Sequence, residues 1–200
     1  MKRFDSLDTI RDEIWRSLLE SFESKEHTFR FPVIATVSNG EPRQRIVVLR
    51  NVYISSRTLL FHTDKRSQKV ADIQRNPVVS WLFYDSRNRI QVRFESKAQI
   101  HDPESELHED EWNATSVAER RIHAVKHAPG TPVSDPDEVW PEEIHHPSQK
   151  LQDIAVGKPN FRVITAEVSF IDWLQLHPEG EFRALFNWDG DSWKGTWACP

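Results

Sequence analysis

Cysteine is nearly absent from this chain of 200 residues, and its scarcity excludes two kinds of site. Cys199, next to the C-terminus, is the single cysteine. A disulfide within the chain and a metal cluster built from thiolates are therefore both impossible. We expect Cys199 to be a free thiol near a chain end.

Glycine is also scarce, with six residues in the whole sequence. Neither the G-x-G-x-x-G pattern of dinucleotide-binding folds nor the G-x-x-x-x-G-K-[ST] pattern of phosphate-binding loops occurs. A G-x-S-x-G nucleophile motif is missing too, which leaves nucleophilic catalysis with little support. If a nucleotide binds, side chains must hold its phosphate.

Long apolar runs and an excess of basic residues are lacking as well. No run approaches the roughly 18 residues of a membrane span, and the N-terminus has no apolar signal-peptide core. We therefore expect a cytoplasmic protein without a membrane partner. The formal net charge of -5 argues against a general nucleic-acid binder, which needs a basic face.

What is present suits one domain with a substantial core. Eight Trp and eleven Phe supply large apolar surfaces although hydrophobic residues make up 38% of the chain. Ile10, Ile14 and Leu18 recur at helical spacing and predict an N-terminal helix, which Ser6 or Asp8 can cap.

From about residue 30 the pattern changes to that of β-strands. Asn39-Gly40 predicts a hairpin turn within a Val- and Ile-rich stretch, and Asp189-Gly190 predicts a closing hairpin. Further strand patterns cover 58–63, 78–84, 89–101 and 160–176, and a short helix is expected over 67–75. We predict a mainly β (α+β) fold of six to seven antiparallel strands with inserted helices. Closing them into a small barrel removes exposed sheet edges.

Residues 102–150 differ in composition, being rich in acidic residues, His and Pro. We predict one or two helices there, with Trp112, Val117, Ile122 and Val125 facing inward. Residues 1–200 are read as a single domain with a helical and loop excursion at about 102–158. His123 and His127 lie four apart and His145-His146 are adjacent. Because no H-E-x-x-H pattern accompanies them, we expect surface histidines and no metal site.

Side chains that can bind an anion recur between residues 45 and 93, and they include Arg45, Arg50, Arg66, Ser67, Lys69, Gln91 and Arg93. Two interpretations are open on composition alone. The charges are either a solvated rim or a phosphate site at the start of a helix, where backbone N–H groups and the helix dipole favour anions.

The order and spacing of several short motifs resemble those of the pyridoxamine 5'-phosphate oxidase family of FMN-binding split barrels. The motifs are R-x-V-x-L at 45–49, F-[YH]-T at Phe61-His62-Thr63, Ser67-Gln68-Lys69, Asn76-Pro77, Gln91-Val92-Arg93, and a C-terminal part with Trp173, Arg183 and 193–200. The similarity covers residues 33–101 and 161–200. It implies an antiparallel split β-barrel with flanking helices.

The resemblance also implies FMN as cofactor and a homodimer with FMN at the subunit interface. Arg45 and Lys69 then correspond to phosphate ligands, with Ser67 nearby, and Trp173 and Arg183 correspond to residues that reach the flavin from the partner subunit. The full set of cofactor-binding residues implied is Arg45, Ile46, Val47, Val48, Leu49, His62, Thr63, Arg66, Ser67, Gln68, Lys69, Gln91, Trp173 and Arg183. No catalytic residue is assigned.

Two departures from the family pattern bear on function. Gln68 stands where the family has a basic residue, so Arg66 is a candidate to supply that phosphate contact instead. Glu179 and Glu181 occupy positions where pyridoxamine-phosphate oxidases carry substrate-binding Arg and His, and acidic residues there would repel a phosphorylated substrate. We therefore expect an FMN-dependent oxidoreductase acting on an unidentified small molecule, and not pyridoxamine 5'-phosphate oxidase itself.

A binding protein without turnover is the alternative. Such a protein would hold flavin or haem for sensing or stress tolerance. A haem would need an axial ligand, for which the sequence offers His101, His108, His123 and His127.

Overall fold

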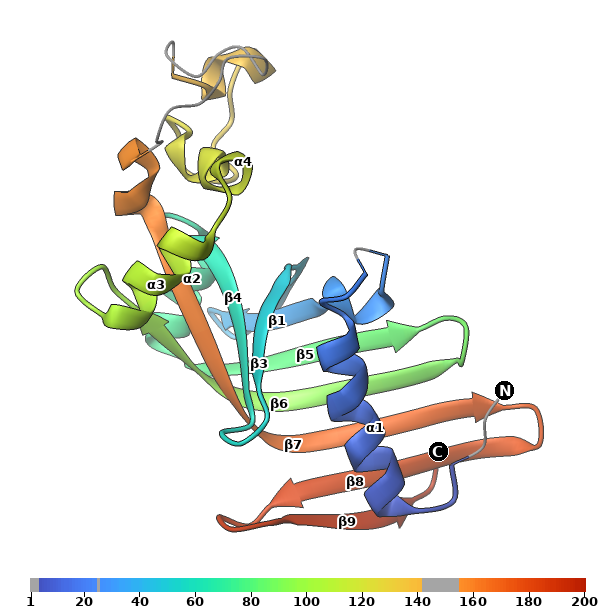
Figure 1. Ribbon diagram of the computed structural model, residues 1–200. Coiled ribbons are helices and arrows are strands. Elements are labelled where there is room, and N and C mark those ends of the chain that lie inside the picture. The colour runs from blue at the N-terminus through green and yellow to red at the C-terminus, as the bar shows by residue number, and fades with distance from the viewer. Residues whose placement is uncertain (1–3, 25, 142–154) are drawn as a thin grey trace.

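The computed structural model describes residues 4–24, 26–141 and 155–200. These residues form one antiparallel sheet of nine strands with helices at its sides (Figure 1). The helices are α1 (Leu7–Glu20), η1 (Thr28–Arg30), α2 (Gln68–Arg75), α3 (Glu106–Ala114), α4 (Val117–Arg120), η2 (Arg121–Ala124), η3 (Pro136–Val139) and η5 (Ala155–Asn160). The strands are β1 (Val33–Ser38), β2 (Glu41–Ile46), β3 (Leu49–Tyr53), β4 (Thr58–Asp64), β5 (Val78–Asp85), β6 (Ile90–His101), β7 (Phe161–His177), β8 (Gly180–Trp188) and β9 (Trp193–Ala198).

The sheet curls because its two end strands are neighbours in the chain. The strand order is β2-β1-β5-β6-β7-β4-β3, with β8 and β9 continuing from β7. Only Val47 and Val48 separate β2 from β3, so the two ends of the path must lie close together. The Val47 N–H donates to the carbonyl oxygen of Pro32 at 3.0 Å and so extends the β1–β2 pairing up to this seam.

Strand β7 divides the sheet into two parts. It has 17 residues and pairs with β6 along one edge, while its other edge pairs first with β4, up to Glu167, and then with β8, from Phe170. The first part belongs to the barrel, and the second extends away from it as a flatter sheet (Figure 1). The predicted mainly β, antiparallel split-barrel fold is confirmed.

The number of strands is higher than the six to seven predicted. One predicted strand breaks at Val47 and Val48, where the chain passes from β2 at one end of the sheet to β3 at the other. The closing hairpin at Asp189-Gly190 is present as predicted, and its two strands are β8 and β9. The Asn39-Gly40 turn between β1 and β2 is as predicted, and both residues have the positive φ (53° and 85°) that such a turn requires.

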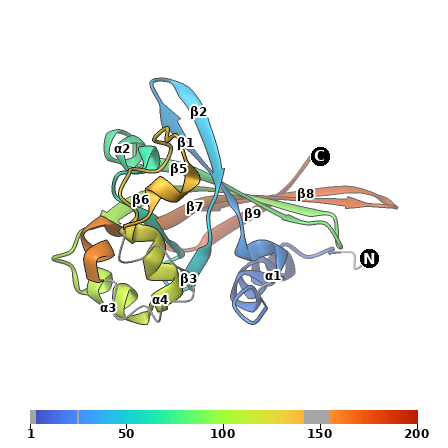
Figure 2. The same ribbon diagram turned by 90° about the horizontal axis from the view of Figure 1, so that it is seen from above.

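Helix α1 covers one face of the sheet (Figure 2). Ser6 caps it by accepting from the Thr9 N–H, and Ile10, Ile14 and Leu18 are buried, as predicted. Trp15 of the same stripe stacks on Phe94 of β6 with ring centroids 6.0 Å apart. Burial of each such side chain contributes about 1.5–3 kcal/mol to folding. In the described part of the chain, no helix is long and apolar enough to cross a membrane.

The excursion after β6 packs on the barrel around the ring of Phe161, at the start of β7, and polar contacts add to this packing. The rings of His62, His108, Trp112 and His123 all meet Phe161 edge-on or tilted, with centroids 4.7 to 5.2 Å away. The prediction that Trp112 faces inward is confirmed, since it is buried.

Two other predictions for the excursion are wrong. Val117 and Ile122 are exposed, Ile122 by 64%, because they do not reach the barrel core. Residues 142–154 of the predicted excursion, His145-His146 among them, lie outside the described residues.

Candidate functional site

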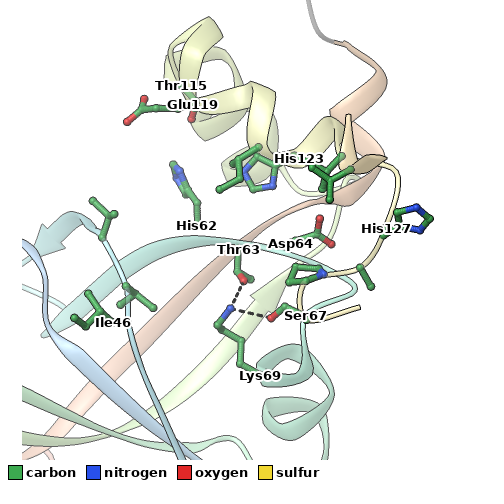
Figure 3. A pocket seen from close by; sticks show the side chains of 18 of the residues that line it. Ile46, His62, Thr63, Asp64, Ser67, Lys69, Thr115, Glu119, His123 and His127 are labelled. Atoms are coloured by element: carbon green, nitrogen blue, oxygen red, sulfur yellow. Dashed lines mark hydrogen bonds between the residues drawn. The ribbon is translucent and has the colours of Figure 1, made fainter. Parts of the chain in front are cut away.

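A cavity of about 670 Å³ lies between the barrel and the excursion (Figure 3). The barrel side comes from the β2–β3 seam, β3, β4 and the start of α2, with Ile46, Val47, Val48, Arg50, His62, Thr63, Asp64, Ser67 and Lys69. The excursion side comes from Thr115, Ala118, Glu119, Ile122, His123, Val125, residues 127–131 and Val139. The volume falls in the range of pockets that hold a cofactor or small ligand.

Lys69 is the cation at the base of this cavity. Its Nζ donates to Thr63 Oγ1 at 2.9 Å and to Ser67 Oγ at 2.8 Å, as the dashed lines in Figure 3 show. Burial, together with the nearby charge of Arg45, lowers the pKa of Lys69 to about 8, and the Asp64 carboxylate only partly opposes this. An anion in the cavity would favour the charged amine.

The first turn of α2 adds backbone donors at the same place. Ser67 is the N-cap residue, yet its side chain makes no capping hydrogen bond, since its hydroxyl accepts from Lys69 instead. The N-terminus of a helix attracts anions through its unpaired N–H groups and its dipole. A candidate binding site for a phosphate or another anion is therefore formed by Lys69, Ser67 and Thr63.

One wall of the cavity is apolar. Ile46, Val47 and Val48 lie at the seam between β2 and β3, and Ile122 and Val125 come from the excursion. Ile46 is 65% exposed, which is unusual for an apolar residue of a strand and suits a surface that a ligand or a second chain covers. An apolar wall next to an anion site fits a flat ring system that carries a phosphate.

Polar contacts join the barrel and the excursion near the other end of the cavity. Arg50 on β3 donates to the carboxylate of Glu119 on α4, and His62 Nε2 lies 2.8 Å from Glu111 Oε2. Burial lowers the pKa of His123 to about 4, so its imidazole is neutral at pH 7. Glu119 lies on the side of the cavity away from Lys69 in Figure 3.

Arg66 is not available to a phosphate in this arrangement. Its guanidinium holds both carboxylate oxygens of Asp64, at 2.9 and 2.7 Å, and donates to the carbonyl oxygens of Val125 and Lys126 in the excursion. It therefore ties the excursion to the barrel. The geometry does not support the idea that Arg66 supplies the contact missing at Gln68.

Arg45 and Gln68 do not line the cavity. They line a separate polar hollow together with Arg43 and Arg75. Both are held by the fully buried Asp72: Gln68 Nε2 donates to it at 3.0 Å, and Arg45 donates to Thr36 Oγ1, which in turn donates to Asp72 Oδ2 at 2.8 Å.

Comparison with known proteins shows which family this chain resembles. Residues 12–102 match the sequence profile described as "Pyridoxamine 5'-phosphate oxidase, FMN-binding domain". A pyridoxamine 5'-phosphate oxidase-related, FMN-binding protein of Nostoc punctiforme PCC 73102 is 25% identical, with a TM-score of 0.72 over 95% of this chain and 96% of that one. The chain therefore resembles the pyridoxamine 5'-phosphate oxidase family, whose FMN-binding domain it matches over residues 12–102.

Two more relatives define how far this similarity extends. Pyridoxine/pyridoxamine 5'-phosphate oxidase 2 of Arabidopsis thaliana is 26% identical over 172 residues, which make up 81% of this chain and 83% of that protein. PhzG of Burkholderia lata 383, solved with tetrahydrophenazine-1-carboxylic acid, has a TM-score of 0.76 over 100% of this chain and 98% of its own. At 16% identity, PhzG shows a likeness of fold alone.

Seven of the residues that the family resemblance singled out line the cavity together. They are Ile46, Val47, Val48, His62, Thr63, Ser67 and Lys69. Leu49 and Trp173 lie in the hydrophobic core instead, where Trp173 packs edge-on against Phe4 with centroids 5.8 Å apart.

Gln91 and Arg183 lie on the opposite face of the sheet from Trp173. Both pair with Leu174 of β7, one from each side, so their side chains share a face. Arg183 holds Asp172 through hydrogen bonds of 2.9 and 2.7 Å, and Arg93 holds the same carboxylate. Neither Gln91 nor Arg183 belongs to the cavity of the described single chain.

The FMN-binding residues expected from the sequence include none from the excursion side of the cavity, where the sequence offered only His123 and His127, as haem ligands. The family match ends at residue 102, and the excursion follows it. Two signals pointed there: apolar residues such as Ile122 and Val125 in an otherwise polar segment, and the S-x-x-E pattern of Ser116 and Glu119, which starts a helix.

Proposed function

We propose that this chain binds FMN in the cavity at Lys69 and acts as an oxidoreductase on a small molecule. One observation carries the proposal. The buried end of the cavity offers a lysine amine whose hydrogen bonds go to two hydroxyls, at the start of a helix and beside an apolar wall. A phosphate joined to a flat apolar ring fits this set of donors and surfaces.

The residues present fit a flavin nucleotide. Lys69, Ser67 and Thr63 would hold its phosphate, and the seam at Val47 and Val48 would lie along its ring. When bound, FMN supplies the exchange of a hydride or of single electrons. The chain's own residues bind and orient the cofactor, and the excursion shields the cavity from water. Because the excursion completes the cavity, we propose that residues 1–200 act as one domain.

We further propose a homodimer, formed through the sheet face that carries Gln91 and Arg183. This face exposes Leu82 and Tyr84 of β5, which pair with Arg93 and Gln91 of β6. Exposed apolar side chains next to a network of charges are typical of a surface that another chain covers. The family resemblance implies that the partner subunit's Arg183 reaches the flavin, and the half-buried Arg183 on this face is compatible with that role.

A haem-binding protein without turnover is the competing function. Two of its candidate axial ligands are already engaged, because His101 Nε2 lies 2.8 Å from Thr165 Oγ1 and His108 Nε2 lies 3.0 Å from the Phe161 carbonyl oxygen. His123 and His127 line the cavity and are the remaining candidates.

The absorption spectrum of the purified protein distinguishes these functions. A bound flavin gives its near-ultraviolet and visible bands, which should bleach on anaerobic reduction and return when a suitable acceptor is added. A Soret band in place of the flavin bands would contradict the proposal. A flavin that cannot be reduced or reoxidised by any small molecule tested would support binding without turnover.

A further inference from the structure

Two strong cations line the described part of the cavity, and their partners differ. Lys69 is hydrogen-bonded to two neutral hydroxyls, so its charge is free to meet an anion. Arg50 is already paired with the carboxylate of Glu119. The cavity therefore presents one uncompensated cation near α2 and a neutralised one near α4.

Glu119 is fixed in place by more than this ion pair. It is the third residue of a capping box at the start of α4, where its Oε2 accepts from Ser116 Oγ at 2.9 Å and from the Ser116 N–H at 3.3 Å. Burial alone would raise the pKa of Glu119, but the hydrogen bonds from Arg50 and Ser116 lower it below its usual value. Its carboxylate is therefore ionised at neutral pH.

We propose that Glu119 makes this cavity selective for substrates that carry no phosphate or carboxylate at the Arg50 end. This inference rests on the proposed function and names its substrate class. An anionic substrate would have to displace Glu119 from Arg50 and Ser116, or lie beside its negative charge, and both are unfavourable. The cavity thus takes one anion, the cofactor phosphate at Lys69, and an uncharged or cationic second ligand.

Glu119→Gln is the variant that isolates the charge. Glutamine keeps the shape of the side chain, and it serves in capping boxes as glutamate does, so α4 should remain intact. Loss of the carboxylate frees the Arg50 guanidinium for an anion. Glu109→Gln is the matched control, since Glu109 forms an ion pair with Lys158 in the same excursion but does not line the cavity.

The probes are pyridoxamine 5'-phosphate and pyridoxamine, which differ only in the phosphate. Flavin content is first measured in every variant, and each probe is then titrated calorimetrically into the purified protein. We expect the wild-type protein and Glu109→Gln to bind the phosphorylated probe no more tightly than pyridoxamine. Glu119→Gln should bind the phosphorylated probe roughly 10- to 100-fold more tightly than wild type does, the usual range for a charge-assisted hydrogen bond.

A double variant, Glu119→Gln with Arg50→Met, should lose the tighter binding of pyridoxamine 5'-phosphate. This loss would show that the freed Arg50 causes the tighter binding. The inference is overturned if the wild-type protein with FMN bound at Lys69 prefers the phosphorylated probe, if folded Glu119→Gln gains nothing, or if the double variant keeps the gain. Absence of flavin from all variants would instead contradict the proposed function, and the comparison of single and double variants would still test Glu119 without any flavin.

Discussion

Replacing Lys69 by methionine should weaken binding of FMN but not of riboflavin, which lacks the phosphate. Methionine has nearly the length of lysine and keeps the apolar part of the side chain. It removes the amine that donates to Thr63 and Ser67. The variant therefore tests the anion site without emptying the cavity.

The expected size of the effect follows from the charge. At pH 7 a lysine with a pKa of about 8 is roughly nine-tenths protonated. A hydrogen bond between charged groups contributes about 1.5–3 kcal/mol, so the affinity for FMN should fall roughly 10- to 100-fold. The affinity for riboflavin should change by less than about threefold, because no phosphate is lost.

The pH dependence of the FMN affinity tests the same assignment. The amine must be protonated to bind the phosphate, and its pKa in the free protein is about 8. FMN affinity of the wild-type protein should therefore fall as pH rises above 8, whereas that of Lys69→Met should stay nearly constant. The folded-state pKa lies below the usual 10.5, so burying the charged amine costs roughly 3 kcal/mol at pH 7. Lys69→Met without ligand should consequently be no less stable than wild type.

Fluorescence titration with FMN and with riboflavin measures both affinities, and Lys65→Met is the matched control. Lys65 lies four residues earlier, is exposed and does not line the cavity. The assignment of the phosphate to Lys69 would be refuted if Lys69→Met lost affinity equally for FMN and riboflavin. It would also be refuted if the control lost as much affinity for FMN as Lys69→Met does.

Three further predictions concern the support around the site. Asp72→Asn should cost about 2 kcal/mol in urea unfolding, because Arg45 and Gln68 lose their buried anchor; unchanged unfolding would show that Asp72 is not that anchor. Phe161→Leu should loosen the excursion, with faster limited proteolysis there and a loss of about 2 kcal/mol; an unaltered cleavage pattern would mean that other contacts hold it. The pKa of His123 is about 4 in the folded protein and 6.5 in the unfolded chain, so the unfolded chain binds more protons between these values. The free energy of unfolding should therefore decrease by up to roughly 3 kcal/mol as the pH is lowered from 6.5 to 4. His123→Gln should remove that part of the acid sensitivity in thermal melts, and an identical pH profile would contradict it.

The strand pattern and the turns could be read from the sequence because they depend on local chemistry. Asn39-Gly40 tolerates the positive φ of a tight turn, and the spacing of Ile10, Ile14 and Leu18 marks one helical face. The anion site at Ser67 and Lys69 could also be predicted from the sequence, since both residues lie at the start of one helix.

Residues whose roles depend on distant contacts could not be placed in this way. Arg45 is oriented by Thr36 and Asp72, and the Thr36–Asp72 bond joins residues 36 positions apart. Leu49 and Trp173 are apolar, and nothing in the sequence distinguishes an apolar residue beside a ligand from one in the core. Ile122 is the converse case, an apolar residue that faces a cavity and not the core.

Equilibrium titration of the apoprotein with FMN, combined with light scattering of the saturated sample, tests the central claim most directly. We predict saturable binding of one FMN per chain, in a particle with the mass of two chains. Absence of saturable FMN binding, or uptake of haem in its place, would contradict the proposal that this cavity is a flavin site.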